Sequence, residues 1–400
     1  MSTINSNQGV PSVASKSTTL AAFYIAGGLR EIIPIYPLYA IMFGANGVSA
    51  FELSLLFVVW AIVGLITEVP SGAWADRYSR KWIVVASGVF KAAGFLTWYL
   101  WQDFPGYALG FIFWGFGSSL RSGAFEALLH DLLKKWDDTQ SFTKHYGRIS
   151  ALATLSAMLG EILGGILIIY GYDFVLLVSM AIPLLASIPF VVWIKETPKD
   201  ALIAEKNYLL HLKEGIGESF QNKSIRFILA TTTFLVVAHG VVDEYVSPIM
   251  YEKGFSLSMI AFLAVPMFLA EAAGEYLADE FDYLEFDHLL TLMILGSACL
   301  VPIFIGTGLL IPTLFTLYFF LFGLASTILA SKLQDKISTD SRATVTSVVG
   351  FGDSLGAIIW FLVIGVAAEI TSISTAVSFF TVLIMAACVI GLWFRRRLQI

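Results

Sequence analysis

The sequence predicts an all-α integral membrane protein with twelve transmembrane helices in two halves of six. Of the 400 residues, 57% are hydrophobic and 14% are charged, whereas a soluble domain has roughly 45–50% and about 25%. The apolar residues form continuous runs, and a bilayer needs roughly 20 such residues per helix. One long polar segment separates six runs from six. This composition excludes most soluble enzymes, and the net charge of −6 argues against a nucleic-acid partner.

The first half is predicted to cover residues 20–194, after a polar tail at residues 1–19. Its spans are expected at 20–44, 50–72, 82–102, 106–133, 147–171 and 174–194. Pro34 and Pro37 interrupt the first span, because proline cannot continue the hydrogen bonding of a helix. Broken helices of this kind often lie near binding sites.

A polar linker is predicted at residues 195–224, followed by the second half at 225–394 and a basic tail at 395–400. The spans of this half are expected at 225–250, 256–279, 288–308, 310–332, 343–367 and 372–394. These runs are continuous rather than alternating, which argues against a β-barrel. They also lack the polar face that the helices of a soluble bundle carry.

The distribution of basic residues predicts the orientation of the chain. With the N-terminus placed inside, the inside segments hold 20 of the 24 Lys and Arg residues, and the outside loops hold only Lys253. Cytoplasmic loops carry an excess of basic residues. We therefore expect both termini in the cytoplasm.

A weak repeat relates the two halves at a constant offset of 203 residues. It pairs the ends of the second and eighth spans, where Glu68 matches Glu271, Ala75 matches Ala278 and Asp76 matches Asp279. Because both segments end the second helix of their half, the repeat favours a parallel duplication with pseudo-two-fold symmetry.

The loop after the second span reads Gly72-Ala-Trp-Ala-Asp76-Arg77-Tyr-Ser-Arg80-Lys81. It resembles the signature loop of the major facilitator superfamily, Gly-x-x-x-Asp-Arg-x-Gly-Arg-Lys, with serine in place of the later glycine. The resemblance covers essentially the whole chain through topology and loop placement. It implies the major facilitator fold, alternating access, a monomer in the membrane lipid of the bacterial inner membrane, and a loop that latches the two halves on the cytoplasmic side. Independently of the family, Gly72 would allow close approach of a helix from the other half. The alternative is that the basic residues of the loop only set topology.

Two further segments resemble the drug:proton antiporter branch of this family. The fifth span contains Ser156-Ala-Met-Leu-Gly160-Glu161-Ile-Leu-Gly164-Gly165, similar to Gly-x-x-x-Gly-Pro-x-x-Gly-Gly. Serine and glutamate replace its first glycine and its proline, which weakens the assignment, although close packing at the three glycines is expected either way. Arg121 in the fourth span resembles the arginine of a second antiporter motif.

Ionisable groups inside a membrane are costly and are functional candidates by default. We expect a site for proton coupling or for substrate from Arg30, Glu31, Arg121, Glu126, His130, Asp131, His239 and Asp243. Glu126 and His130, and likewise His239 and Asp243, are four residues apart and share a helix face. Arg30 and Glu31 are adjacent and are expected to point toward different partners.

Glu31 and Glu126 are our candidates for the groups that exchange protons, with Arg30 and Arg121 as their charge partners. The alternative is a static network of buried salt bridges, and Asp243 could simply be solvated at the outer mouth. Lys91, in the third span, is expected to snorkel or to pack.

The remaining buried carboxylates fall on helices that form the interface between the halves in this fold. They are Glu68, Glu161, Glu271, Glu275 and Asp353. For Glu68 and Glu271, gating and plain hydrogen bonding between helices are equally open. No metal site and no cofactor is expected, since the proton gradient would supply the energy.

These observations predict a proton-coupled secondary transporter for a small organic solute, not an enzyme. Efflux of a drug, siderophore or other metabolite is favoured by the antiporter-like segments. Two alternatives stay open at this stage. One is a symporter or facilitator for nutrient uptake, and the other is a polytopic sensor or enzyme, for which no zinc motif or phosphate loop is present.

Overall fold

The computed structural model describes residues 15–195, 223–336 and 342–398. Most of the predicted N-terminal tail, nearly all of the predicted linker at 195–224 and the last two residues of the basic tail lie outside these ranges. Every described span is α-helical, with short 3₁₀ segments, which confirms the predicted all-helical class. Among the described residues, nine helices are long and apolar enough to cross a membrane.

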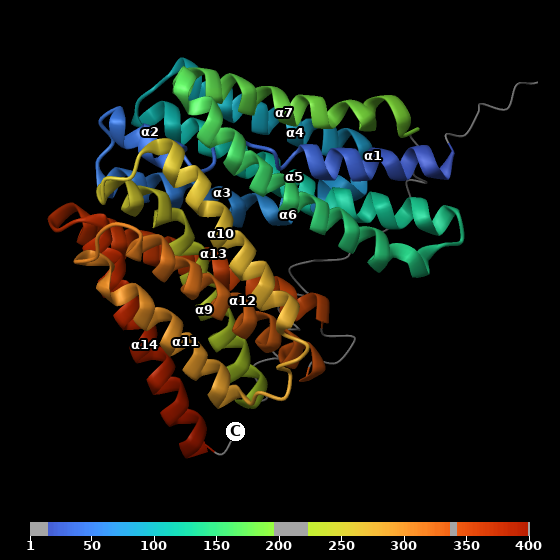
Figure 1. Cartoon of the computed structure of the whole chain (residues 1–400). Helices are drawn as coiled ribbons and strands as arrows, with labels where there is room; N and C mark the ends of the chain where they lie inside the picture. The colour runs from blue at the N-terminus through green and yellow to red at the C-terminus, as the bar shows by residue number, and fades with distance from the viewer. Residues whose placement is uncertain (1–14, 196–222, 337–341, 399–400) are drawn as a thin grey trace, which may run out of the picture.

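The first half contains seven α-helices, because its first span is divided in two (Figure 1). They are α1 (Lys16–Leu29), α2 (Tyr39–Ala45), α3 (Ala50–Arg77), α4 (Arg80–Leu100), α5 (Phe104–Lys135), α6 (Phe142–Leu167) and α7 (Tyr172–Trp193). The 3₁₀ segments η1 (Thr139–Ser141) and η2 (Ile168–Tyr170) flank α6. The intact helices begin and end within a few residues of the predicted spans.

The second half follows the same order of helices. It contains α9 (Lys223–Glu252), α10 (Leu257–Leu277), α11 (Phe286–Leu300), α12 (Leu310–Lys336), α13 (Arg342–Ile370) and α14 (Ile373–Leu398), with η3 (Val301–Phe304) after α11. Each of these helices corresponds to one predicted span.

The break between α1 and α2 lies where the two prolines predicted it. The backbone between these helices needs partners from elsewhere, and the N–H of Ile35 donates to Oγ of Ser179 on α7 at 3.1 Å. We call residues 30–38, between α1 and α2, the broken segment. Glycines of α6 leave room for it. A Cβ atom at Gly164 would lie 2.4 Å from the carbonyl oxygen of Pro34, and one at Gly160 would lie 2.7 Å from the nitrogen of Ile33. The close packing predicted at these glycines is confirmed.

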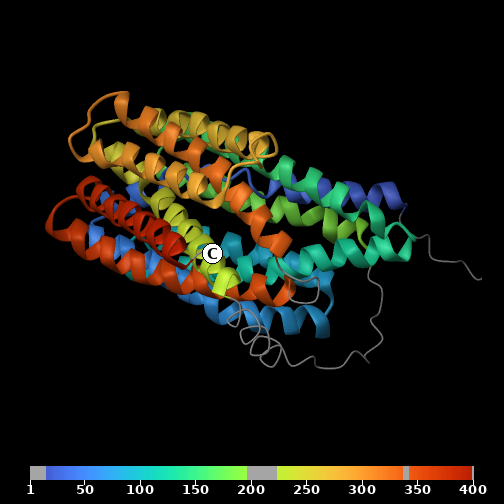
Figure 2. The same ribbon diagram turned by 90° about the horizontal axis from the view of Figure 1, so that it is seen from below.

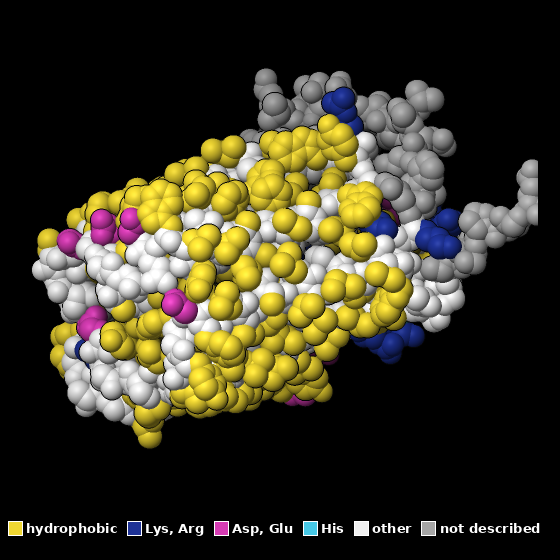
Figure 3. Space-filling view, turned by 90° about the horizontal axis from the view of Figure 1, so that it is seen from above, with side chains coloured by type: hydrophobic (Ala, Val, Ile, Leu, Met, Phe, Trp, Pro, Cys, Tyr) yellow, Lys and Arg dark blue, Asp and Glu magenta, His cyan; other side chains and the backbone are white. Residues whose placement is uncertain are grey.

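The helices of both halves run between the same two ends of the molecule (Figures 1 and 2). We call the end where α1 begins and α14 ends the terminal end, and the other the opposite end. Hydrophobic side chains cover most of the face seen in Figure 3, and Lys and Arg side chains gather toward the terminal end. Large apolar side chains such as Ile66 and Leu155 are exposed, as expected for a surface that meets lipid.

The two halves touch closely at the opposite end and diverge toward the terminal end (Figure 1). A Cβ atom at Gly365 of α13 would lie 2.6 Å from Cβ of Ser54 on α3, and one at Gly165 of α6 would lie 3.1 Å from the carbonyl oxygen of Ser258 on α10. No described atom lies within 4 Å of a Cβ at Gly72, near the terminal end of α3. The close approach expected at Gly72 is therefore wrong for this conformation, because the halves are apart at that depth.

Candidate functional site

A cavity of about 270 Å³ lies between the two halves. The first half contributes the aromatic side chains of Tyr36 from the broken segment, Tyr39 from α2 and Trp114 from α5, together with Glu161 of α6. The second half contributes Asp243 and Glu244 of α9, and apolar side chains of α10 and α12, including Phe268 and Phe319. A ligand in this cavity would contact both halves at once.

Hydrogen bonds between the halves close the opposite end of the cavity. The hydroxyl of Tyr39 donates to the carboxylate of Glu244. The hydroxyls of Ser54 and Tyr245 are 2.7 Å apart. Near the surface, the N–H of Phe51 on α3 donates to Oε2 of Glu369 on α13 at 3.0 Å. Because the terminal ends are apart, this arrangement has the form of a transporter open toward its termini.

A cluster of charges lies next to the cavity in the first half. Nε of Arg30 is 3.5 Å from Oε1 of Glu31, and Nζ of Lys91 is 3.8 Å from Oε2 of the same carboxylate. The expectation that Arg30 and Glu31 point toward different partners is wrong. It assumed helical geometry, whereas α1 ends at Leu29 and both residues lie in the broken segment.

Lys91 is the member of this cluster that the sequence analysis missed. Its side chain is only 3% exposed, so it does not snorkel to the membrane surface. Its ammonium lies 5.2 Å from the ring centroid of Tyr36 and 5.8 Å from that of Trp114. A lysine near the middle of an apolar span was the only available signal.

The two aromatic rings form a wall between Lys91 and the cavity. Tyr36 and Trp114 stack with ring centroids 5.2 Å apart and planes 10° apart. Both rings line the cavity, whereas Lys91 does not. The guanidinium of Arg121 lies 4.3 Å from the ring centroid of Phe125. Arg121 does not line the cavity either. Among the described residues that do, all the charged side chains are carboxylates.

The predicted residues of α9 have different partners in the structure. Asp243 faces the cavity. His239 instead places Nε2 3.2 Å from Oε1 of Glu271 on α10, and its ring stacks on Phe322 with centroids 3.7 Å apart. Within the described part of the chain, Nδ1 of His239 is buried without a hydrogen-bond partner. Glu275 is exposed one turn after Glu271.

Three predicted residues of α5 lie outside the cavity lining. Glu126 accepts a hydrogen bond from the hydroxyl of Tyr146 at 2.5 Å. His130 packs against Phe142 with ring centroids 5.7 Å apart. Asp131 forms an ion pair with Arg80. Each of these three residues therefore has a partner outside the cavity lining.

The signature loop connects helices of the first half in this conformation. Arg80 pairs with Asp131 of α5, and its guanidinium also donates to the carbonyl oxygens of Ala75 and Ala127. Nζ of Lys81 donates to the carbonyl oxygen of Val191 on α7 at 3.0 Å. Arg77 is exposed, and the side chain of Asp76 lies outside the described residues.

The carboxylates of the predicted interface take different positions. Glu68 of α3 is exposed, and a Cβ atom at Gly350 of α13 would lie 3.9 Å from its Oε1. One carboxylate oxygen of Asp353, one turn along α13, is buried and has no hydrogen-bond partner among the described residues. Glu161 of α6 lines the cavity. No group of three or more His, Cys, Asp or Glu among the described residues is placed to hold a metal ion.

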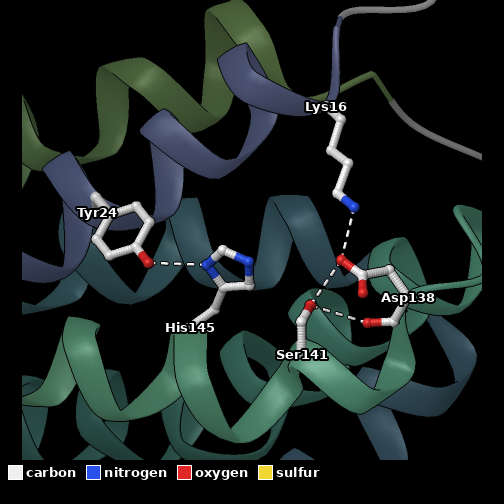
Figure 4. A network of polar contacts seen from close by, with 5 residues as sticks. All are labelled: Lys16, Tyr24, Asp138, Ser141 and His145. Atoms are coloured by element: carbon white, nitrogen blue, oxygen red, sulfur yellow. Dashed lines mark hydrogen bonds and ion pairs between the residues drawn. The ribbon is translucent and has the colours of Figure 1, made fainter.

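A separate polar network ties α1 to the segment before α6 at the terminal end (Figure 4). Nζ of Lys16 donates to Oδ2 of Asp138 at 2.6 Å, and the hydroxyl of Ser141 donates to the same oxygen at 2.7 Å. These hydrogen bonds, first that of Lys16, lower the pKa of Asp138. The hydroxyl of Tyr24 lies 2.8 Å from Nδ1 of His145.

Comparison with known families places this geometry in context. The model of the Major Facilitator Superfamily matches residues 18–361. An uncharacterized transporter of this type from Bacillus subtilis, YxaM, is 27% identical over 260 residues, which is 61% of this chain and 62% of that protein. The multidrug resistance protein MdtG of Citrobacter koseri is 24% identical over 253 residues, 61% of this chain and 59% of that protein. The matched stretch thus spans less than two thirds of these relatives.

Solved structures share the fold at low sequence identity. The nucleoside transporter NupG superposes with a TM-score of 0.75 at 13% identity, over 94% of this chain and 98% of that one. A bacterial homologue of the human lysosomal transporter Spinster, solved in an inward-facing and unoccupied conformation, has a TM-score of 0.70 at 16% identity, over 95% of this chain and 96% of that one. At these identities the likeness concerns the fold alone.

Proposed function

The chain belongs to the Major Facilitator Superfamily and is a secondary transporter rather than an enzyme, and from this premise we propose that it exports a small organic solute in exchange for protons by alternating access. The observation that carries this proposal is the cavity between the halves. It is closed at the opposite end by the hydrogen bond from Tyr39 to Glu244, which an outward-open state would have to break.

Proton coupling is proposed at Glu31 and Glu126. Glu31 lies between Arg30 and Lys91, so adding a proton would leave two cations without their shared carboxylate. Such a change in charge can favour one arrangement of the halves over another. Glu126 is exposed on the terminal side and accepts a hydrogen bond from Tyr146, a position from which it could exchange protons with water.

Efflux and orientation complete the proposal. The sequence similarity to a protein named for multidrug resistance favours export over uptake.

The basic residues at the terminal end favour a cytoplasmic location for both termini, in the inner membrane of a bacterium. A monomer is proposed as the working unit. In the outward-open state, the loop containing Asp76, Arg77, Arg80 and Lys81 would latch the terminal ends of the two halves.

The direction and the coupling can be tested together in membrane vesicles. We expect everted vesicles with an acidic lumen to accumulate radiolabelled solutes from a panel of cations, zwitterions and anions. The accumulation should stop when nigericin collapses the pH gradient. Glu31→Gln and Glu126→Gln should uncouple it, whereas Asp173→Asn, at a surface carboxylate bonded to Gln102, should not.

Two results would contradict parts of the proposal, one the proton coupling and the other the direction of export. Accumulation that ignores the pH gradient would remove proton coupling. Accumulation only in right-side-out vesicles with an acidic exterior would instead establish uptake by symport, which the fold permits equally.

A further inference from the structure

We infer that the cavity between the halves binds a compact organic cation with an aromatic or flat apolar body, held between Glu161 of α6 and Asp243 of α9. This inference rests on the proposed function, because it takes the cavity as the translocation site. It goes further by naming the class of solute and the two side chains that select it.

The charge of the cavity lining favours a cation. Its charged residues, within the described part of the chain, are Glu161, Asp243 and Glu244. The nearby bases do not offset them at the cavity surface. Lys91 lies behind the stacked rings of Tyr36 and Trp114 and faces the carboxylate of Glu31. An anion entering this space would meet three carboxylates and no base.

Glu161 lacks the partner that a buried carboxylate needs. The residue is only 5% exposed, and it forms no hydrogen bond or ion pair with any of the described residues. Glu244, in contrast, accepts a hydrogen bond from Tyr39. Burial of an unpaired charge is costly, and a cation beside the carboxylate would offset that cost. Glu161 therefore points to a site that is completed by its ligand.

The two selecting carboxylates belong to different halves. Glu161 is on α6 and Asp243 is on α9, and both line the same cavity. Two carboxyl groups that face one cavity repel each other when both are ionised, and a cation between them would offset this repulsion. The same ligand would therefore favour the arrangement in which the halves close around it.

The apolar walls define the body of the ligand. Tyr36 and Trp114 present a flat stacked surface on one side, and Phe268 and Phe319 line the other half. Aromatic faces attract cations as well as flat apolar groups. The volume of about 270 Å³ is just below the about 300–1,000 Å³ of cavities for drug-sized ligands, which favours a small solute. A solute with a single ring and one ammonium group fits this description.

Three probes that differ chiefly in charge test the inference on the purified full-length protein. Benzyltrimethylammonium is a permanent cation, 3-phenylpropionate is an anion, and 3-phenylpropanol is neutral. Isothermal titration calorimetry in detergent should show binding of the cation and at least tenfold weaker binding of the other two. Glu161→Gln and Asp243→Asn should each weaken binding of the cation at least tenfold, and Asp173→Asn should leave it unchanged.

Several outcomes would overturn the inference. They are tighter binding of the anion, unchanged binding of the cation to both cavity variants, and failure of the cation to bind at all. Asp243→Asn provides a second test if Glu161→Gln does not fold. Because calorimetry needs no gradient, binding without pH-driven transport would refute only the proposed function. Transport restricted to anions would refute only the choice of ligand.

Discussion

Replacing Tyr39 with phenylalanine should shift the molecule away from the conformation described here. The hydroxyl of Tyr39 is the donor to Glu244 across the two halves. The ring is buried and packs on Trp98 with centroids 5.7 Å apart, a contact that phenylalanine retains. The substitution therefore removes one hydrogen bond between the halves and little else.

The size of the shift follows from the type of bond. A hydrogen bond to a charged group contributes about 1.5–3 kcal/mol. Since each 1.4 kcal/mol is about a tenfold change in an equilibrium constant, Tyr39→Phe should favour separation at the opposite end by roughly 10- to 150-fold. The terminal ends should approach each other correspondingly more often.

Pulsed electron spin resonance in lipid nanodiscs can measure this shift. Spin labels at Tyr78 and Tyr276, which are exposed at the terminal ends of α3 and α10, report the separation of the halves. Cys299 and Cys388 must first be replaced, because both are free thiols. Tyr39→Phe should increase the share of short distances between the labels.

A second tyrosine provides a matched control. The hydroxyl of Tyr107 accepts a hydrogen bond from Nδ2 of Asn46 at 2.6 Å, and both residues belong to the first half. Tyr107→Phe should leave the distance distribution unchanged. If Tyr39→Phe also leaves it unchanged, or if both variants shift it equally, the hydrogen bond to Glu244 does not hold the opposite end closed.

Three further predictions concern stability and can be checked by thermal unfolding of the purified protein. Lys91→Met should destabilise it by less than the about 3–5 kcal/mol of a fully broken buried ion pair, because Arg30 still faces Glu31, and Lys91→Arg should lose less than Lys91→Met. Gly164→Ala should lower the free energy of unfolding by about 1–3 kcal/mol through overpacking, because the new Cβ would meet the backbone of Pro34. Gly123→Ala is the control, since its Cβ would meet no atom within 4 Å, and it should not lower the stability. The pKa of Asp138 is lowered in the folded state, first by its hydrogen bond from Lys16. This bond should therefore stabilise the protein at pH values above 3.8, the ordinary pKa of the group. The stabilisation should be lost as the pH falls below that value and the carboxylate takes up a proton. The melting temperatures of the wild type and Asp138→Asn should therefore differ at neutral pH and converge in acid; a constant difference would argue against this linkage.

Much of the architecture could be predicted because the bilayer restricts the choices. Continuous apolar runs of about 20 residues can satisfy their backbone only as helices, so the twelve spans could be located to within a few residues. Pro34 and Pro37 likewise indicated the broken first span. The glycines of α6 indicated close packing, and the structure identifies the broken segment as the element packed against them.

The composition of the site was less predictable. Glu161 was expected at the interface of the halves and lines the cavity between them, and Lys91 packs in the interior as one of its two expected positions. The pairing of Lys91 with Glu31 was not predicted. Periodicity within one helix cannot show which side chains of α4, α6 and α9 meet. Glu126 and His130 share a helix face, but neither lines the cavity, and Glu126 instead bonds with Tyr146 of α6.

The sequence by itself determined the membrane class, the order of the helices and the family resemblance, because each depends on local composition and on a short contiguous motif. Only the tertiary structure decided which charges face one another. It gave His239 a partner in Glu271 of α10, and it placed Glu161 across a cavity from α9. The physical reason is that electrostatic partners are set by distances between helices, and these depend on how the two halves pack and on which end of them is closed.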